Sequence, residues 1–205
     1  LSKERSKLER LGISLPPFPL TAVGSFPPLM GLKEAREKFD RGFVDAQEMD
    51  SQIKRSTEYW IRVQEKMGFD VLVDGEFYRD NMVSYFAEQI PGFFPGEPVR
   101  IFGQHYQRKP LIVGELRWPG PITEKWWRFA QSLTSKPVKA IVTGPYTLMD
   151  RSFDEYHESR EAACLALAQV IRLEVEHLVA SGAKIVQIDE PAFLARSGDW
   201  SFAHE

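Results

Sequence analysis

The stretch KIVQIDEPAF, residues 184–193, gives the first indication of the fold. Its apolar run is typical of a buried strand, and it stops at two adjacent carboxylates, Asp189 and Glu190, and a proline that a ladder strand does not accommodate. The preceding segment, 154–181, has a helical pattern, and Gly182 follows it in the position where glycine commonly ends a helix. A long helix that leads into a buried strand is the repeating unit of a parallel α/β sheet.

The same arrangement recurs earlier in the chain. Apolar runs at 20–26, 69–76 and 138–145 each end at glycine or acidic residues, and helical patterns cover 32–68 and 123–134. The carboxyl ends of parallel strands gather at one edge of a sheet, where ligands bind. A TIM (β/α)8 barrel takes about 250 residues and eight strands. We therefore expect an α/β protein with about the first four strands of such a barrel.

The domain organisation is expected to be simple. Residues 1–205 are interpreted as a single domain, the N-terminal half of the barrel, and the helical pattern at 32–68 as two helices with a break near Gly42. The region 91–121 is rich in glycine, proline and aromatic residues. We expect it to be an excursion with a β-hairpin that pairs 99–102 with 111–116.

Composition excludes several classes of function. The net charge of -3 gives no cationic surface for nucleic acid, and no apolar run approaches the roughly 20 residues that span a bilayer. The single cysteine, Cys164, rules out an intrachain disulfide, so a cytoplasmic protein is expected. The four histidines have no metal-ligand spacing, and they are His105, His157, His177 and His204. We expect no metal site in this chain.

The acidic residues at the strand ends have two interpretations. A single carboxylate after a strand is often the N-cap of the next helix, and a single glycine often only makes a turn. Two of the four strand ends carry such acids, however, and their residues should meet at one rim. The group therefore favours a ligand site more strongly than any one member does.

Five segments together resemble a known family. TAVGSFP, GFDVLVDGEFYRDNMVSYFAEQIPGF, PLIVGEL, AQSLTSKPVKAIVTGPYTL and IVQIDEPAF resemble, in order and approximate spacing, the C-terminal catalytic barrel of cobalamin-independent methionine synthase. The resemblance runs over residues 20–193, and the combination is specific although each segment alone is weak. It implies a methyltransferase of methionine biosynthesis, which transfers a methyl group to the thiol of homocysteine and uses Zn²⁺ to hold the sulfur as a thiolate.

The resemblance also implies residue roles. Glu76 and Asp189 would hold the ammonium group of homocysteine, and the turn Val23, Gly24 and Ser25 would bind its carboxylate. Glu190 would support the site or a nearby main chain. Further candidates for support or for the methyl-donor site are Asp74, Arg79, Asn81, His105, Tyr106 and Arg151.

Two positions depart from the folate-using members of the family. Those members carry an Arg-Cys pair in the excursion and a Trp before the Ser-Phe that follows TGP. His105-Tyr106 and Arg151 stand at these positions here. Without the indole, the stacking surface for a pterin is reduced. A corrinoid or a corrinoid protein is therefore expected as the methyl donor in preference to a methylfolate.

The zinc ligands of the family, an H-x-C pair followed by Glu and Cys, lie after the IDEP strand, and the sequence given ends at Glu205. We therefore expect a fragment that is inactive alone. Two alternatives stay open. One is a related thiol methyltransferase or lyase of the same superfamily that acts on another small thiol, and the other is a non-catalytic amino-acid-binding fragment.

Overall fold

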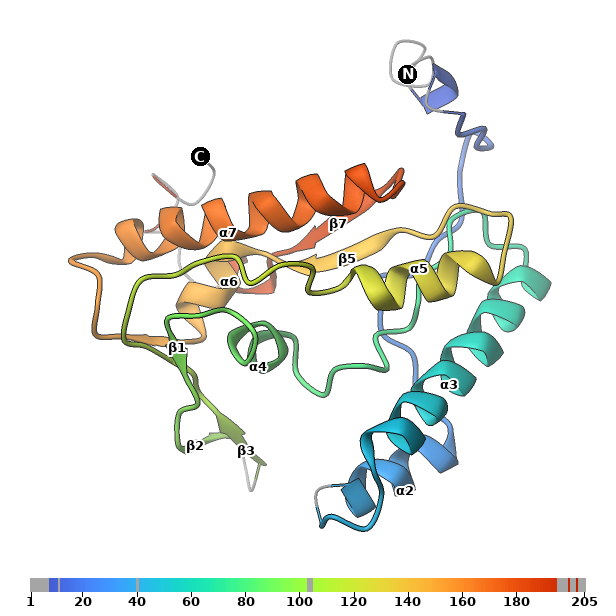
Figure 1. The fold of residues 1–205 in the computed structure, drawn as a ribbon. Coiled ribbons are helices and arrows are strands. Elements are labelled where there is room, and N and C mark those ends of the chain that lie inside the picture. The colour runs from blue at the N-terminus through green and yellow to red at the C-terminus, as the bar shows by residue number, and fades with distance from the viewer. Residues whose placement is uncertain are drawn as a thin grey trace. The chain divides into compact units, whose positions relative to one another are not determined.

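The computed structural model describes residues 8–10, 12–39, 41–102, 105–194, 199 and 202, and for 98–102 and 105–108 it describes the backbone. The fold is mixed α/β (Figure 1). The chain forms two compact units, each built from three stretches. The first unit comprises Leu1–Tyr78, Glu124–Ala140 and Ser181–Val186, and the second comprises Arg79–Thr123, Ile141–Ala180 and Gln187–Glu205.

Helices of the first unit are α2 (Met30–Phe39), α3 (Ala46–Lys66) and α5 (Glu124–Ser132). The two helices predicted for 32–68 are confirmed, and Gly42, at φ +75°, lies between them. Helix α3 packs against α2 and against α5 (Figure 1). The buried side chains Leu32, Ile53 and Phe77 form an apolar cluster in this unit.

The four segments that were predicted as parallel strands pair with one another in the order in which they occur in the chain. A single bridge joins Thr21 to Val71, and another joins Leu72 to Val138. Strands β5 (Ala140–Thr143) and β7 (Val186–Asp189) then form a two-stranded sheet. The first two predicted strands are therefore reduced to isolated bridges, while the last two are regular. In the part of the chain that the structure describes, the strands do not close into a barrel.

Helices of the second unit are α4 (Met82–Ala87), α6 (Pro145–Asp150) and α7 (Arg160–Ala180), followed by the 3-10 helix η1 (Pro191–Leu194). Helix α6 packs against α7 (Figure 1). Helix α7 begins later than its sequence pattern predicts, because β6 (Phe153–Asp154) and a turn occupy the first six residues. Its end is as predicted, since Gly182 has a φ of +102°.

The excursion pairs differently from the prediction. Strand β2 (Pro98–Phe102) pairs with β3 (His105–Arg108), so the expected partner at 111–116 is wrong. Strand β4 (Leu111–Ile112) instead pairs with β1 (Phe93–Phe94) and, in parallel, with β6. The polar sequence of β3 lacks the apolar alternation that marks a strand, which is why sequence reasoning missed it.

A buried carboxylate holds the segment that leads from the excursion to α5. Glu174 on α7 has no exposed surface and accepts a hydrogen bond from Trp118 Nε1 at 2.9 Å. It also accepts bonds from Ile122 N at 3.0 Å, Thr123 N at 2.8 Å and Thr123 Oγ1 at 2.9 Å. These four donors replace the hydrogen bonds from water that a carboxylate loses on burial.

Residues 8–10 are helical. Among the helices that the structure describes, none is long and apolar enough to cross a membrane.

Candidate functional site

Glu76 is held in an unusual backbone conformation at the end of the second parallel segment. Its φ is +60°, and no other non-glycine residue in the described ranges has a positive φ. Asp74 Oδ1 accepts a hydrogen bond from Glu76 N at 3.0 Å and so fixes the turn. Gly75, at φ +85°, allows the ring of Phe77 to approach, because a Cβ there would lie 2.3 Å from it. Strained conformations of this kind cluster at functional sites.

The predicted Gly24-Ser25 turn lies against this carboxylate. Ser25 Oγ donates a hydrogen bond to Glu76 Oε2, and Phe26 N donates to Gly75 O at 3.3 Å. Gly24 is buried, whereas the side chain of Val23 points to solvent and is 79% exposed. The structure therefore brings together two residues, Ser25 and Glu76, that the sequence assigned to opposite ends of one ligand.

Asp189 ends β7 in the second unit, where its Oδ1 accepts a hydrogen bond from Gln187 Nε2 at 2.6 Å. Its side chain is half-buried. The assignment of Asp189 to the ammonium group stays a prediction.

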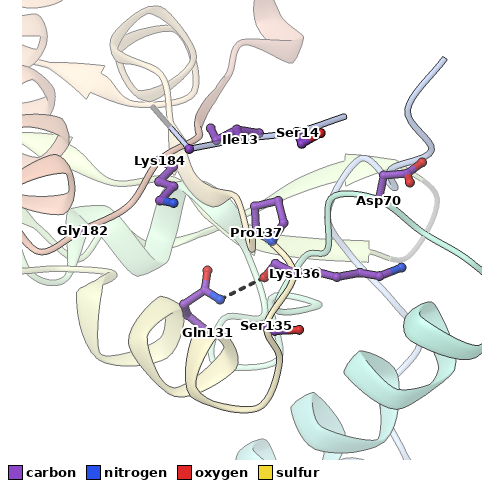
Figure 2. A pocket seen from close by; sticks show the side chains of 10 residues that line it. Ile13, Ser14, Asp70, Gln131, Ser135, Lys136, Pro137, Gly182 and Lys184 are labelled. Atoms are coloured by element: carbon purple, nitrogen blue, oxygen red, sulfur yellow. Dashed lines mark hydrogen bonds between the residues drawn. The ribbon is translucent and has the colours of Figure 1, made fainter. Parts of the chain in front are cut away.

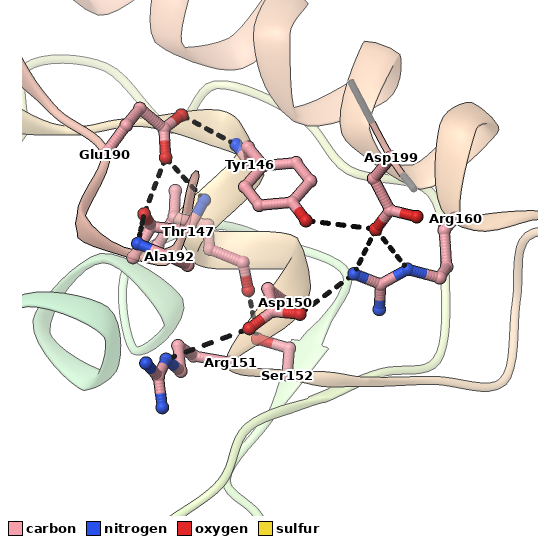
Figure 3. A network of polar contacts seen from close by, with 10 residues as sticks. Tyr146, Thr147, Asp150, Arg151, Ser152, Arg160, Glu190, Ala192 and Asp199 are labelled. Carbon is pink, nitrogen blue, oxygen red and sulfur yellow. Dashed lines mark hydrogen bonds and ion pairs between the residues drawn. The ribbon is translucent and has the colours of Figure 1, made fainter. Parts of the chain in front are cut away.

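Glu190 completes the hydrogen bonding at the start of α6. Gly144, the N-cap of α6, has no side chain with which to cap the helix. Glu190 supplies the missing acceptors, taking hydrogen bonds from Tyr146 N at 2.8 Å, Thr147 N at 2.7 Å and Thr147 Oγ1 at 2.6 Å (Figure 3). The IDEP carboxylate thus caps the helix that the TGP motif begins.

Burial raises the pKa of Glu190 above its ordinary value of 4.5, although the hydrogen bonds from Thr147 and from the backbone of Tyr146 and Thr147 offset part of this effect. The proximity requires a glycine at position 144, where a Cβ would lie 2.1 Å from Glu190 Oε1. The glycine of TGP and the second acid of IDEP are therefore parts of one contact. A signal was present in the sequence, namely a helix start with no capping side chain.

A second polar network lies around the same helix (Figure 3). Arg160 Nη2 pairs with Asp150 Oδ1 at 2.9 Å and with Asp199 Oδ2 at 2.8 Å. Tyr146 donates its hydroxyl to Asp199 Oδ2 at 3.0 Å, and burial together with this bond raises the Tyr146 pKa. Asp150 also lies 3.9 Å from Arg151 Nε. Both ends of α6 are thus held by charged side chains.

The other predicted site residues have local roles. Asn81 is the N-cap of α4 and accepts hydrogen bonds from Val83 N and Ser84 N at 2.8 and 3.0 Å. Arg79 is buried and donates to Thr143 Oγ1 at 3.2 Å. Their roles in a methyl-donor site stay predictions.

Arg151 is the C-cap of α6, and its side chain is 54% exposed. His105 and Tyr106 lie on β3, and their side chains fall outside what the structure describes. The donor-site roles of these three residues also stay predictions.

A cavity of about 460 Å³ lies at the opposite ends of the parallel segments in the first unit. Its lining includes Asp70, Pro137 and Lys184, each of which precedes an extended segment, together with Lys136 (Figure 2). None of the predicted site residues lines it. The cavity and the Ser25-Glu76 pair are separate features.

The described residues do not fit a zinc ion. Among them, no three His, Cys, Asp or Glu side chains gather as a metal centre requires. Burial also raises the pKa of Cys164 to about 11, which opposes formation of the thiolate that binds zinc.

Most of the chain matches a known protein family. Residues 18–199 match the family model described as the catalytic domain of cobalamin-independent synthase. The chain belongs to this family. The resemblance seen in the sequence is thereby confirmed.

Curated relatives in the cobalamin-independent synthase family carry the name 5-methyltetrahydropteroyltriglutamate–homocysteine methyltransferase. The chain is 39% identical over 204 residues to the one from Xylella fastidiosa strain 9a5c and 42% identical over 202 residues to the one from Mesorhizobium japonicum. These matches cover 97% and 96% of this chain and 27% and 26% of the relatives. The chain thus spans about a quarter of their length.

A solved structure shows the same fold over a larger share of its chain. It is a B12-independent methionine synthase from Shewanella sp. W3-18-1 in complex with selenomethionine, at a TM-score of 0.74 and 25% identity. The match covers 89% of this chain and 55% of that one.

Proposed function

We propose that the intact protein transfers a methyl group to the thiol of homocysteine, and that this chain supplies the grip on the amino-acid end of that substrate. The observation that carries the proposal is the contact between Ser25 and Glu76. A carboxylate can hold the ammonium group of an amino acid, while a hydroxyl and the nearby backbone N–H groups can hold its carboxylate. Family membership and the names of the relatives support this role.

Asp189 is proposed as the second carboxylate for the ammonium group. The fold proposed for the intact domain is a (β/α)8 barrel, with this chain as about its first half. The parallel order of the described segments and the match to about half of a solved relative support it. In the intact protein, zinc would supply activation of the thiol, and the ligands for it are expected outside this chain.

The donor we propose is a methylated folate. The names of the relatives include 5-methyltetrahydropteroyltriglutamate, and the solved relative is named as B12-independent. These names outweigh the preference for a corrinoid that the absence of an indole at Arg151 suggested, because an exposed guanidinium can also stack on a flat heterocycle. Methylfolate and methylcobalamin, offered separately to the intact protein, distinguish the two donors by the methionine formed.

The test of the grip is homocysteine binding by the intact protein, measured by calorimetry. Glu76→Gln keeps the shape of the side chain and removes its charge, so we expect binding to weaken by about tenfold or more. Glu176→Gln is the matched control, because Glu176 is an exposed carboxylate that pairs with Arg172 on α7. If the Glu76 and Glu176 variants bind homocysteine equally well, the proposed grip is wrong.

A further inference from the structure

Ser25 and Glu76, two residues of the proposed grip, are each held by a different helix of the first unit. On the Ser25 side, the ring of Phe26 stacks on Trp60 of α3, with centroids 4.4 Å apart. Trp60 Nε1 also donates to Pro27 O at 2.9 Å. The chain that carries Ser25 is therefore fixed to α3.

On the Glu76 side, the support comes from α2. Arg36 lies in the last turn of this helix and donates from Nη2 to Phe77 O at 2.7 Å. That carbonyl belongs to the residue directly after Glu76. Leu32, one turn earlier on α2, packs with the Phe77 ring in the buried cluster. Backbone and side chain of Phe77 are thus held by one face of one helix.

These contacts fix the backbone on both sides of Glu76. Before it, Asp74 accepts the Glu76 N–H, and the Gly75 carbonyl accepts from Phe26 N. After it, Arg36 is the donor. A non-glycine residue at a φ of +60° persists only where its surroundings over-determine it. Without the Arg36 bond, the segment that follows Glu76 loses its charged donor and can relax toward ordinary backbone angles.

We propose that Arg36 is a positioning residue, which holds the Glu76 carboxylate in place for the amino-acid end of the substrate. The inference rests on the proposed role of Glu76. Arginine suits the task because its guanidinium stays charged and makes a stronger bond to a carbonyl than a neutral donor does. Arg36 itself need not touch the ligand.

The experiment measures homocysteine affinity in the intact protein for Arg36→Met, Arg36→Lys and Glu76→Gln. Arg36→Met is expected to weaken binding about tenfold, and Arg36→Lys, which keeps a charged donor, about threefold. Arg62→Met is the matched control. Arg62 on α3 also donates to a backbone carbonyl, that of Leu133 at 2.9 Å, but it has no contact with the Glu76 turn. This control should stay within about twofold of the wild type.

Combining the substitutions separates positioning from a general loss of stability. If Arg36 acts through Glu76, adding Arg36→Met to Glu76→Gln changes affinity by less than about twofold, because the residue that Arg36 positions has already lost its function. A full additional tenfold loss, or equal affinities for the Arg36→Met and Arg62→Met proteins, would overturn the inference. If Arg36→Met does not fold, Arg36→Lys gives the same comparison when it is made in the wild-type protein and in the Glu76→Gln protein.

The same measurements distinguish the two proposals. Wild-type affinity in the Glu76→Gln protein refutes the proposed grip and the role of Arg36 with it. Weak binding by Glu76→Gln combined with wild-type binding by Arg36→Met leaves the grip intact and refutes the positioning role alone.

Discussion

The carboxylate of Glu190 occupies the space that a side chain at Gly144 would need, since a Cβ there would lie 2.1 Å from Oε1. The same carboxylate caps α6 through Tyr146 N and Thr147 N. The TGP and IDEP motifs are therefore coupled in structure, whatever each contributes to binding.

Gly144→Ala should destabilise the second unit. The φ of Gly144 is -74°, which alanine adopts without strain, so the cost comes from the clash with Glu190 alone. We expect a loss of about 1–3 kcal/mol in the free energy of unfolding, measured by urea denaturation. Gly114→Ala is the control, because its Cβ would meet only Gly92 Cα, at 3.8 Å. Equal losses in the two variants would contradict the clash.

The raised pKa of Glu190 predicts a pH dependence. The folded state holds this proton more tightly than the unfolded state, whose pKa is about 4.5. The stabilising contribution of the proton is therefore complete below pH 4.5 and is lost as pH rises from there through the folded pKa. Compared with Glu190→Gln, which does not titrate, the wild type should lose stability as the pH rises above 4.5 in urea denaturation. If the wild type instead becomes more stable relative to Glu190→Gln as the pH rises, the pKa of Glu190 is lowered in the folded state.

Glu174→Gln tests the buried carboxylate of α7. The amide keeps one acceptor oxygen but turns a donor toward the N–H groups of Trp118, Ile122 and Thr123. The expected loss is about 2 kcal/mol in the free energy of unfolding, followed by the fluorescence of the tryptophans. Glu176→Gln, two residues along the same helix and 56% exposed, should change it by less than about 0.5 kcal/mol. Comparable effects would mean that Glu174 is not the anchor described.

Much of the fold could be predicted because its signals are local. Gly42 and Gly182 mark helix ends, and both have the positive φ that makes glycine informative there. The pairing of β4 with β1 and β6 depends on contacts distant in sequence, and β3 has no apolar alternation, so periodicity alone could not find either.

The candidate site also has parts that could be predicted from the sequence and parts that could not. Ser25 and Glu76 were expected near one another, because the ends of parallel strands gather at one edge of a sheet, but the hydrogen bond between them was not itself predicted. That Glu190 is the partner of the uncapped start of α6, and that Arg36 bonds to Phe77, could not be predicted, because each contact joins segments more than 40 residues apart through a geometry that no spacing encodes.

Arg151→Trp tests the proposed folate donor in the intact protein. Arg151 is exposed at the end of α6 and makes only a loose pair with Asp150, so an indole there should cost little stability. Stacking of the indole on a pterin is expected to lower the KM for methylfolate by about threefold to tenfold, with kcat nearly unchanged. Arg172→Trp, on the exposed face of α7 with 59% of its side chain accessible, is the control and should leave KM as it was. An unchanged or higher KM in the Arg151→Trp protein would show that position 151 does not face the donor.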